Sequence, residues 1–217
     1  NSIAGSILPN LGILHNSRLQ VTGEYYLHIR QNLMALPGVR LEDIEEVHSH
    51  PMALLQCVDF LDTHRWRLVE TEDTALSARR IAERGIRNAA AIAGDLAAEL
   101  FGLEIVAADI HSIRNNYTRF LVLRPDHQPI DERSDKASLC FKTDHRHGSL
   151  IRVLREMEDS TINMTKLQSS PIPSEPWHYM FHVDMEFACM DDYNRVIERM
   201  RSVTSELHVY GVYRKGQ

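Results

Sequence analysis

The order of strand and helix patterns in residues 136–217 constrains the fold more than any other feature of the sequence. Apolar residues spaced three and four apart predict one helix around 150–157 and a second around 193–200. Four further runs are rich in β-branched and aromatic residues. These predicted strands are 136–143, 162–167, 177–187 and 207–213. The resulting order of strand, helix, strand, strand, helix and strand is the ferredoxin-like βαββαβ arrangement.

The preceding part of the chain predicts a different α/β unit. Short strands alternate with helices there, which indicates helices packed on a sheet. The predicted strands are 19–29, 44–47, 88–93, 105–108 and 118–123, and the predicted helices are 51–61, 75–84 and 94–101. Residues 125–135 contain two prolines and few apolar side chains, so we expect a linker. We therefore predict one domain over 1–124 and a second over 136–217.

Charge balance and cysteine content limit the classes of function. Lys and Arg number 24 against 30 Asp and Glu, a net charge of −6, so the chain is a poor candidate for binding nucleic acid. The sequence contains no apolar run of the roughly 18 residues that a membrane span needs. Three widely spaced cysteines without a Cys-x-x-Cys motif favour a reducing compartment, and we expect a cytoplasmic protein. Asn1–Ser6 does not resemble a signal peptide, and we expect further chain upstream of it.

Two histidine pairs raise the question of a metal site. His48 and His50, like His145 and His147, are two residues apart, which on a strand places both side chains on one face. The sequence near either pair lacks the Cys, Asp or Glu cluster that would complete a four-ligand set, so loop histidines, one of them capping a helix, are favoured. The sequence also lacks a Gly-x-Ser-x-Gly elbow, a Gly-x-Gly-x-x-Gly motif and a P-loop. We expect neither a metal nor an organic cofactor.

A set of polar residues, nearly all without a carboxylate or ammonium group, falls at the predicted ends of strands and helices. Hydroxyls, amides and helix N-termini recognise carboxylates and hydroxyls well, but they are weak nucleophiles without a base partner. Such a set suits a small anionic metabolite whose reaction needs orientation and one proton donor; the alternative is that these residues are caps and turns. The members are Asn1, Ser2, Ser49, His50, Gln56, Thr74, Asn116, Thr118 and Arg119.

Short motifs along the chain occur in a recognisable order. They are Asn1–Ser6, Ser49–Cys57, Ala89–Ala93 with Gly102–Leu103, Asn116–Phe120, Gly148–Ile151, Asn163–Pro171 and Leu207–Tyr213. Together they resemble the prephenate dehydratase family, in which a catalytic domain precedes an ACT regulatory domain. The resemblance implies a periplasmic-binding-protein-like catalytic domain over 1–124, with its active site in a cleft, and an ACT domain over 136–217.

The same resemblance implies conversion of prephenate to phenylpyruvate, water and carbon dioxide in phenylalanine biosynthesis. It assigns the role of proton or hydrogen-bond donor to Thr118. The residues it implies for orienting the substrate are Asn1, Ser49 and Gln56, with Ser2, His50, Thr74 and Asn116 as second choices. Arg119 would pair either with a substrate carboxylate or with a structural acid.

Regulation is implied as well. In the resembling family L-phenylalanine inhibits by binding at the interface of paired ACT domains, so we expect a homodimer or homotetramer. The positions implied for the effector are Gly148, Leu150, Asn163 and Met164. Gln168 and Ser170 replace the Glu and Arg of the family motif, so we expect an altered response to phenylalanine.

One departure keeps two alternatives open. The opening part of the family's catalytic domain, with its Gly-Pro-x-Gly turn, has no counterpart before Asn1, so the first lobe is expected to be incomplete. The protein could therefore be a non-catalytic, amino-acid-sensing ACT protein. Within enzymes, arogenate dehydratase is the alternative, because arogenate differs from prephenate only by an amino group on the side chain.

Overall fold

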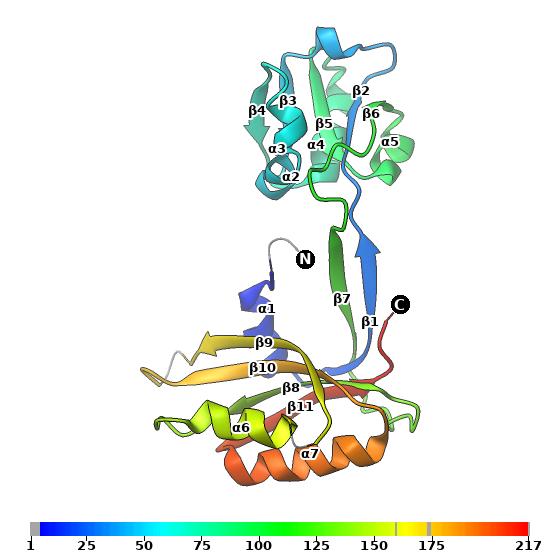
Figure 1. The fold of residues 1–217 in the computed structure, drawn as a ribbon. Helices are drawn as coiled ribbons and strands as arrows, with labels where there is room; N and C mark the ends of the chain where they lie inside the picture. The colour runs from blue at the N-terminus through cyan, green and yellow to red at the C-terminus, as the bar shows by residue number, and fades with distance from the viewer. Residues whose placement is uncertain (1–4, 159, 173–174, 217) are drawn as a thin grey trace. The chain divides into compact units, whose positions relative to one another are not determined.

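The computed structural model describes residues 5–158, 160–172 and 175–216 (Figure 1). Asn1 and Ser2, two of the predicted site residues, lie outside this part of the chain. The described residues form two compact units, one of 27–118 and the other of 6–26 together with 119–216. The division crosses two paired strands, β1 (Gln20–His28) and β7 (Tyr117–Arg124), and in β7 it falls between Thr118 and Arg119.

The unit of residues 27–118 is built on a five-stranded sheet of order β4-β3-β5-β2-β6. Strand β3 is parallel to β4 and β5, whereas β2 is antiparallel to β5 and β6. The strands are β2 (Asn32–Ala35), β3 (Glu46–Ser49), β4 (Arg67–Glu70), β5 (Ala89–Ala93) and β6 (Glu104–Ala107). The helices are η1 (Leu41–Asp43), α2 (Pro51–Gln56), α3 (Val58–Leu61), α4 (Thr74–Arg84) and α5 (Asp95–Phe101).

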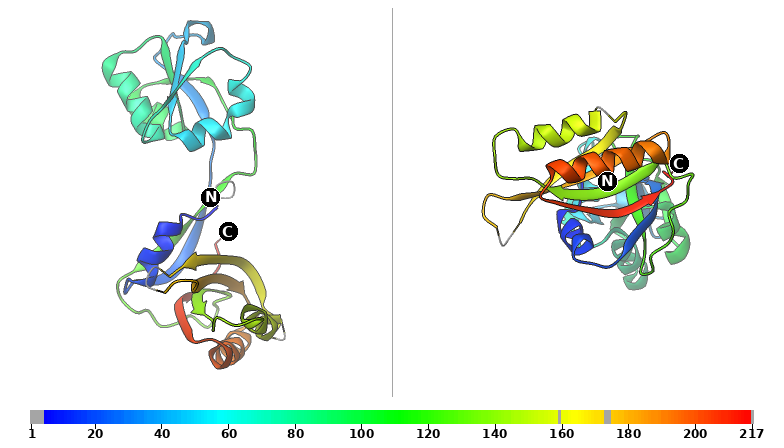
Figure 2. Two further views of the ribbon diagram at one scale, coloured as in Figure 1. Left: turned by 90° about the vertical axis from the view of Figure 1, so that its left-hand side faces the viewer. Right: turned by 90° about the horizontal axis from the view of Figure 1, so that it is seen from below.

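Strand β5 explains why helices cover both faces of this sheet (Figure 2). All five of its residues are buried, and successive side chains point to opposite faces. Ala90 and Ile92 pack with residues of α2 and α3, and Ala89, Ala91 and Ala93 pack with residues of α4 and α5. A central strand buried on both faces is typical of α/β sheets.

The helix predicted over 51–61 is wrong in one respect, because it is broken into α2 and α3 at Cys57. Cys57 leaves the helical region at φ −114° and ψ 16° and ends α2 while preceding α3. The apolar spacing is nevertheless used, since Leu54, Cys57 and Leu61 all enter the same core cluster. In contrast, α4 matches its prediction: the Asp73 side chain accepts a hydrogen bond from the Leu76 N–H, and Gly85 ends the helix at φ 63°.

The second unit contains a four-stranded antiparallel sheet of order β11-β8-β10-β9. Its elements are β8 (Lys136–Lys142), α6 (Ser149–Glu158), β9 (Asn163–Pro171), β10 (Tyr179–Glu186), α7 (Met190–Val203) and β11 (Glu206–Tyr213). Their order confirms the predicted βαββαβ arrangement. Helices α6 and α7 cover one face, and Leu139, Val153, Val183 and Val196 lie in the core between them and the sheet (Figure 1).

The other face of this sheet is covered by the N-terminal part of the same unit. Leu14 from α1 (Leu8–His15) and Val21 from β1 pack against Cys140 and Tyr210 of the sheet. Strand β11 comes so close that a Cβ on Gly211 would lie 1.8 Å from the Val21 carbonyl oxygen. Residues 6–26 therefore fold with the C-terminal unit, which differs from the predicted boundary at 124.

His182, on β10, makes this unit sensitive to acid. Its ring is buried, with Nε2 3.0 Å from the Ser170 hydroxyl and Nδ1 3.1 Å from the Tyr210 hydroxyl. Burial, assisted by neighbouring cations, lowers the pKa of His182 to about 4, against about 6.5 in the unfolded chain. The unfolded state therefore binds the proton first, so stability is complete above pH 6.5 and is lost as the pH falls toward 4.

We expect His182→Gln to flatten this pH dependence. Between pH 7 and pH 4 the wild-type free energy of unfolding should fall by up to about 3 kcal/mol more than that of the variant. Urea unfolding at a series of pH values measures the difference. Parallel curves for the two proteins would show that His182 is not the group responsible.

Candidate functional site

The candidate site of the first unit lies at one edge of its sheet. Strands β3, β4 and β5 run in the same direction, and so does β6, because both β5 and β6 are antiparallel to β2. Their carboxyl ends therefore meet at one edge, which we call the carboxyl edge. In open α/β sheets, ligands bind outside this edge. Ser49 ends β3 at this edge and His50 follows it, Thr74 begins α4 after β4, and residues 108–116 follow β6.

Ser49 and His50 form the junction between β3 and α2. The Ser49 side chain is fully buried, and its hydroxyl donates to the Ile92 carbonyl over 2.7 Å. His50 caps α2, because its Nδ1 accepts from the Met52 N–H at 3.1 Å. His48 Nε2 instead contacts the Glu46 carboxylate at 2.9 Å. The two histidines thus have separate partners: His50 is a helix cap, as predicted, whereas His48 lies on strand β3 and not in a loop.

Gln56 belongs to a buried polar cluster. Its Oε1 accepts a hydrogen bond from the side-chain amide of Gln31 at 3.2 Å, and both side chains are buried. The Gln31 N–H donates to His111 Nδ1 at 3.4 Å, and the Gln31 carbonyl accepts from the Ile110 N–H at 2.9 Å. Sequence reasoning missed Gln31 and His111. Neither belongs to one of the motifs, and only the pairing of residues about 80 apart along the chain brings them together.

Asn116 is the most informative residue at this edge. It is fully buried, and among the described residues neither its Oδ1 nor its Nδ2 has a hydrogen-bond partner. Its backbone carbonyl accepts from the Ile29 N–H at 2.8 Å, which holds the start of β7 against the end of β1. Because a buried amide without partners is costly, Asn116 indicates a place where a polar ligand or ordered water completes the site.

Thr118 and Thr74 occupy element starts, as predicted. Thr118 is the second residue of strand β7, two positions after Asn116, and is half-buried. Thr74 is the first residue of α4, and the cap of that helix is Asp73. The structure thus places Thr74 at the carboxyl edge with Ser49 and His50.

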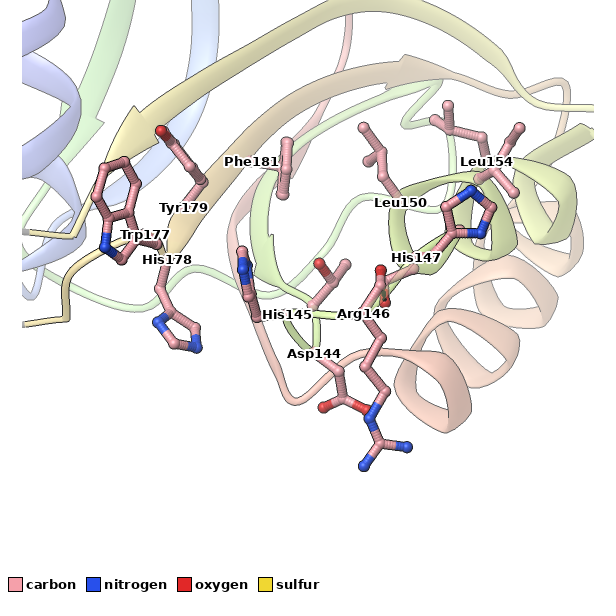
Figure 3. A pocket seen from close by; sticks show the side chains of 14 residues that line it. Asp144, His145, Arg146, His147, Leu150, Leu154, Trp177, His178, Tyr179 and Phe181 are labelled. Atoms are coloured by element: carbon pink, nitrogen blue, oxygen red, sulfur yellow. Dashed lines mark hydrogen bonds between the residues drawn. The ribbon is translucent and has the colours of Figure 1, made fainter.

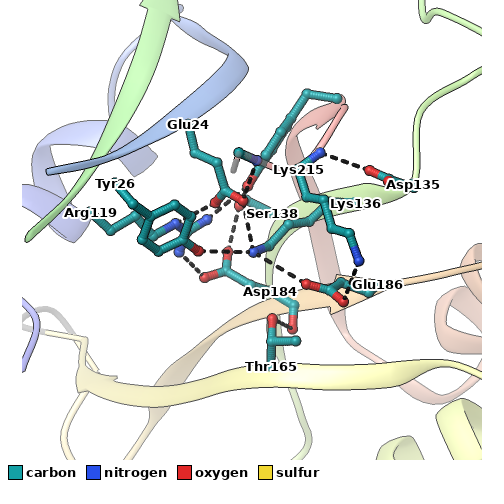
Figure 4. A network of polar contacts seen from close by, with 12 residues as sticks. Glu24, Tyr26, Arg119, Asp135, Lys136, Ser138, Thr165, Asp184, Glu186 and Lys215 are labelled. Atoms are coloured by element: carbon teal, nitrogen blue, oxygen red, sulfur yellow. Dashed lines mark hydrogen bonds and ion pairs between the residues drawn. The ribbon is translucent and has the colours of Figure 1, made fainter. Parts of the chain in front are cut away.

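Arg119 belongs to the other unit and is held by acids of that unit (Figure 4). Its Nε donates to Glu24 at 2.5 Å, its Nη1 to Asp184, and its Nη2 to the Tyr213 hydroxyl at 2.8 Å. Burial alone would lower the pKa of Arg119, but the neighbouring carboxylates outweigh it and raise the pKa. The structural ion pair, and not the substrate-carboxylate role, matches this geometry.

A second site is a pocket of about 610 Å³ in the C-terminal unit (Figure 3). Leu150 and Leu154 of α6 and Phe181 of β10 form its apolar part. Gly148 also lines it, and its φ of 76° is a backbone conformation that favours glycine. The pocket volume is typical of small-molecule sites. The other two predicted effector residues, Asn163 and Met164, lie on β9 and do not line the pocket.

Polar and charged side chains surround the rest of this pocket. Asp144, His145, Arg146 and His178 contribute both charge signs, and the His145 and His178 rings are 5.5 Å apart. An aspartate and an arginine at one pocket offer a carboxylate for the ammonium group and a guanidinium for the carboxylate group of a free amino acid. Within the ranges that the structure describes, no three His, Cys, Asp or Glu side chains gather in a metal-binding arrangement.

None of the helices in the described segments combines the length and the apolar character of a membrane span.

Known proteins resemble this chain over most of its length. The family model described as "Prephenate dehydratase" matches residues 1–128. The chain is 35% identical over 224 residues to "Arogenate dehydratase/prephenate dehydratase 2, chloroplastic" of Arabidopsis thaliana. The alignment covers 98% of this chain and 59% of that protein. The chain thus spans about three fifths of the length of this curated relative.

Solved structures show the same fold. A prephenate dehydratase of Arthrobacter aurescens in complex with L-Phe is 26% identical, with a TM-score of 0.85 over 97% of this chain and 71% of that one. GqqA, described as a novel type of quorum quenching acylases, is 26% identical, with a TM-score of 0.88 over 99% of this chain and 79% of that one. The family match over more than half of the chain decides the assignment: the chain belongs to the prephenate dehydratase family.

Proposed function

We propose that the protein catalyses the decarboxylating dehydration of prephenate to phenylpyruvate in phenylalanine biosynthesis. The observation that carries this proposal is the carboxyl edge of the first unit in a chain of this family. There the buried Asn116 amide lacks partners among the described residues, two positions before Thr118. Amides and hydroxyls of this kind suit a dicarboxylate whose reaction needs orientation and one proton donor.

The proposed reaction gives each group at the edge a limited task. The ring-bound carboxylate of prephenate leaves as carbon dioxide, and its electron pair moves into the ring. The ring becomes aromatic as the carbon–oxygen bond to the hydroxyl group breaks, and the departing hydroxide takes a proton to become water. Thr118 donates the hydrogen bond or proton to that oxygen, and Asn116 and Gln56 orient the substrate.

Ser49 supports the site indirectly in this proposal. Its proton is already used in the hydrogen bond to Ile92, so the hydroxyl can offer a substrate only lone pairs. The bond joins the end of β3 to β5 and thereby fixes the loop that begins at His50. Asn1 and Ser2 keep the orienting roles implied by the sequence, as predictions outside the described residues.

The C-terminal unit is proposed to be an ACT regulatory domain that binds L-phenylalanine in the pocket beside Gly148 and Leu150. The βαββαβ topology, the apolar pocket wall and the neighbouring Asp144 and Arg146 support this. The A. aurescens relative is described with L-Phe bound. Association into a homodimer or homotetramer and a cytoplasmic location stay predictions of the sequence.

The proposed function is tested by incubating the full-length protein with prephenate and, separately, with arogenate. We expect phenylpyruvate and carbon dioxide from prephenate, and less product when L-phenylalanine is present. Preferential consumption of arogenate would identify the protein as an arogenate dehydratase, an activity that the name of the Arabidopsis relative also includes. Heat of L-phenylalanine binding without product from either substrate would favour the non-catalytic sensor. Cleavage of an acyl substrate in place of both would point to the chemistry named for GqqA.

A further inference from the structure

A buried cluster of charges in the C-terminal unit joins the β1–β7 strand pair to the four-stranded sheet. We define this ion cluster as Glu24 on β1, Arg119 on β7, Lys136 on β8 and Asp184 on β10 (Figure 4). Their side chains are 0%, 19%, 4% and 7% exposed, respectively. Two acids and two bases balance, so the cluster as a whole carries no net charge.

Each acid of the ion cluster accepts hydrogen bonds from two of the neighbouring side chains. Glu24 accepts from Arg119 at 2.5 Å and from Lys136 at 2.9 Å, and Asp184 accepts from Arg119 and, at 2.5 Å, from the Ser138 hydroxyl. Burial alone would lower the pKa of Lys136, but the Glu24 carboxylate raises it above the usual range. The acids thus favour the charged forms of Lys136 and Arg119, and the contacts of Arg119 fix β7 against β10.

Arg119 is the residue that follows Thr118 in β7. Their Cα atoms are therefore about 3.8 Å apart by covalent geometry alone. Successive strand residues point to opposite faces, so a guanidinium held on one side sets the direction of the threonine side chain on the other. Catalytic groups lose much of their effect when they are displaced by about 1 Å.

Asp184 also lies on the strand that forms part of the pocket. Phe181, a pocket residue, precedes Asp184 by three positions on β10, a separation of about 10 Å along an extended strand. Asp184 further pairs in register with Lys166 of β9 and Ser138 of β8. One strand therefore carries both a wall of the pocket and the acid that holds Arg119.

We infer that Asp184 and Glu24 are positioning residues for Thr118 and act through Arg119. Ligand binding in the pocket then affects the position of the start of β7 through Asp184. This inference rests on the proposed function for the role of Thr118 and for L-phenylalanine as the pocket ligand. Neither acid needs to touch the substrate for this role.

Asp184→Asn tests the inference, because it removes one charge and keeps the shape of the side chain. In the full-length protein we expect kcat for prephenate to fall about tenfold while KM stays within about twofold, because binding groups at the carboxyl edge are untouched. Inhibition by L-phenylalanine should also weaken about tenfold although calorimetry still detects binding. The matched control, Asp191→Asn, changes an exposed carboxylate at the start of α7 and should leave all three quantities unchanged.

Hydrogen–deuterium exchange gives a readout that does not depend on turnover. In the wild type, L-phenylalanine should slow exchange of the amides at 117–120, and Asp184→Asn should speed their exchange and abolish the response to L-phenylalanine. Unchanged exchange at 117–120 in a folded Asp184→Asn protein, or an unchanged kcat and L-phenylalanine response, would overturn the inference. A wild type that makes no product but shows these exchange changes would contradict the proposed function and not the positioning role. If Asp184→Asn does not fold, Ser138→Ala, which keeps all four charges, should give smaller changes in the same direction.

Discussion

Turnover of prephenate is expected to fall by about 10²- to 10⁴-fold when Thr118 is replaced by alanine. A positioned proton donor contributes a factor of this size, and the alanine side chain cannot donate. KM should change little, because the groups proposed to hold the carboxylates remain. Steady-state production of phenylpyruvate by the full-length Thr118→Ala protein measures both quantities.

Two further substitutions control this experiment. Thr118→Ser keeps a hydroxyl group and should retain turnover within about tenfold of the wild type. Thr22→Ala removes a strand threonine from β1, whose hydroxyl contacts the Val122 carbonyl at 3.4 Å, and should leave turnover unchanged. Wild-type turnover by a folded Thr118→Ala protein would remove Thr118 from the mechanism.

The largest loss of stability is expected for Glu24→Ala. The Glu24 side chain is fully buried between Arg119 and Lys136 and also accepts from the Gly216 N–H at 3.0 Å. Its removal leaves Arg119 with Asp184 and Lys136 with Glu186 at 3.6 Å, and takes away the acid that joins the two buried cations. Breaking a buried ion pair in this way costs about 3–5 kcal/mol. Urea unfolding at pH 7, followed by circular dichroism, measures the change.

Glu132→Ala is the matched control for this measurement. Glu132 is exposed in the predicted linker of the same unit, and its loss should change the free energy of unfolding by less than about 0.5 kcal/mol. A Glu24→Ala protein as stable as the control would show that water or rearranged side chains compensate the two cations. The account of the ion cluster would then be wrong.

Local patterns predicted much of the fold because local contacts determine those elements. The Asp73 cap and Gly85 define α4 within one stretch of sequence, and the order of strands and helices after 136 needs only short connections. The helix over 51–61 was predicted too long because apolar spacing does not reveal the change of backbone direction at Cys57. Strands β2 and β4 were not predicted, because β2 contains no β-branched or aromatic residue and β4 contains a single valine, so their composition gives little strand signal.

Non-local contacts explain what the sequence did not predict. Helix α1 contains Pro9 and Gly12, so its sequence gives little helical signal, and it is stabilised by packing of Leu14 on the distant sheet. The partners of Arg119 lie 95 and 65 positions away along the chain, at Glu24 and Asp184. Such partners have no local signature, and only the folded structure decides between a substrate-binding and a structural arginine.

The candidate site shows the same division. Sequence motifs indicate Ser49, Gln56, Asn116 and Thr118. The structure places Ser49 and Gln56 in defined hydrogen bonds. It places Asn116 in a buried position where its side-chain amide has no partner among the described residues. Gln31 joins Gln56 only because β2 begins at the same edge where α2 ends.

The most direct test of the site is a crystal structure of the full-length protein with a non-reactive dicarboxylate analogue of prephenate. The account predicts that the analogue binds at the carboxyl edge, with its hydroxyl-bearing carbon next to the Thr118 hydroxyl and a polar atom within hydrogen-bond distance of the Asn116 amide. An analogue bound away from both residues, with the Asn116 amide hydrogen-bonded to water alone, would contradict the account.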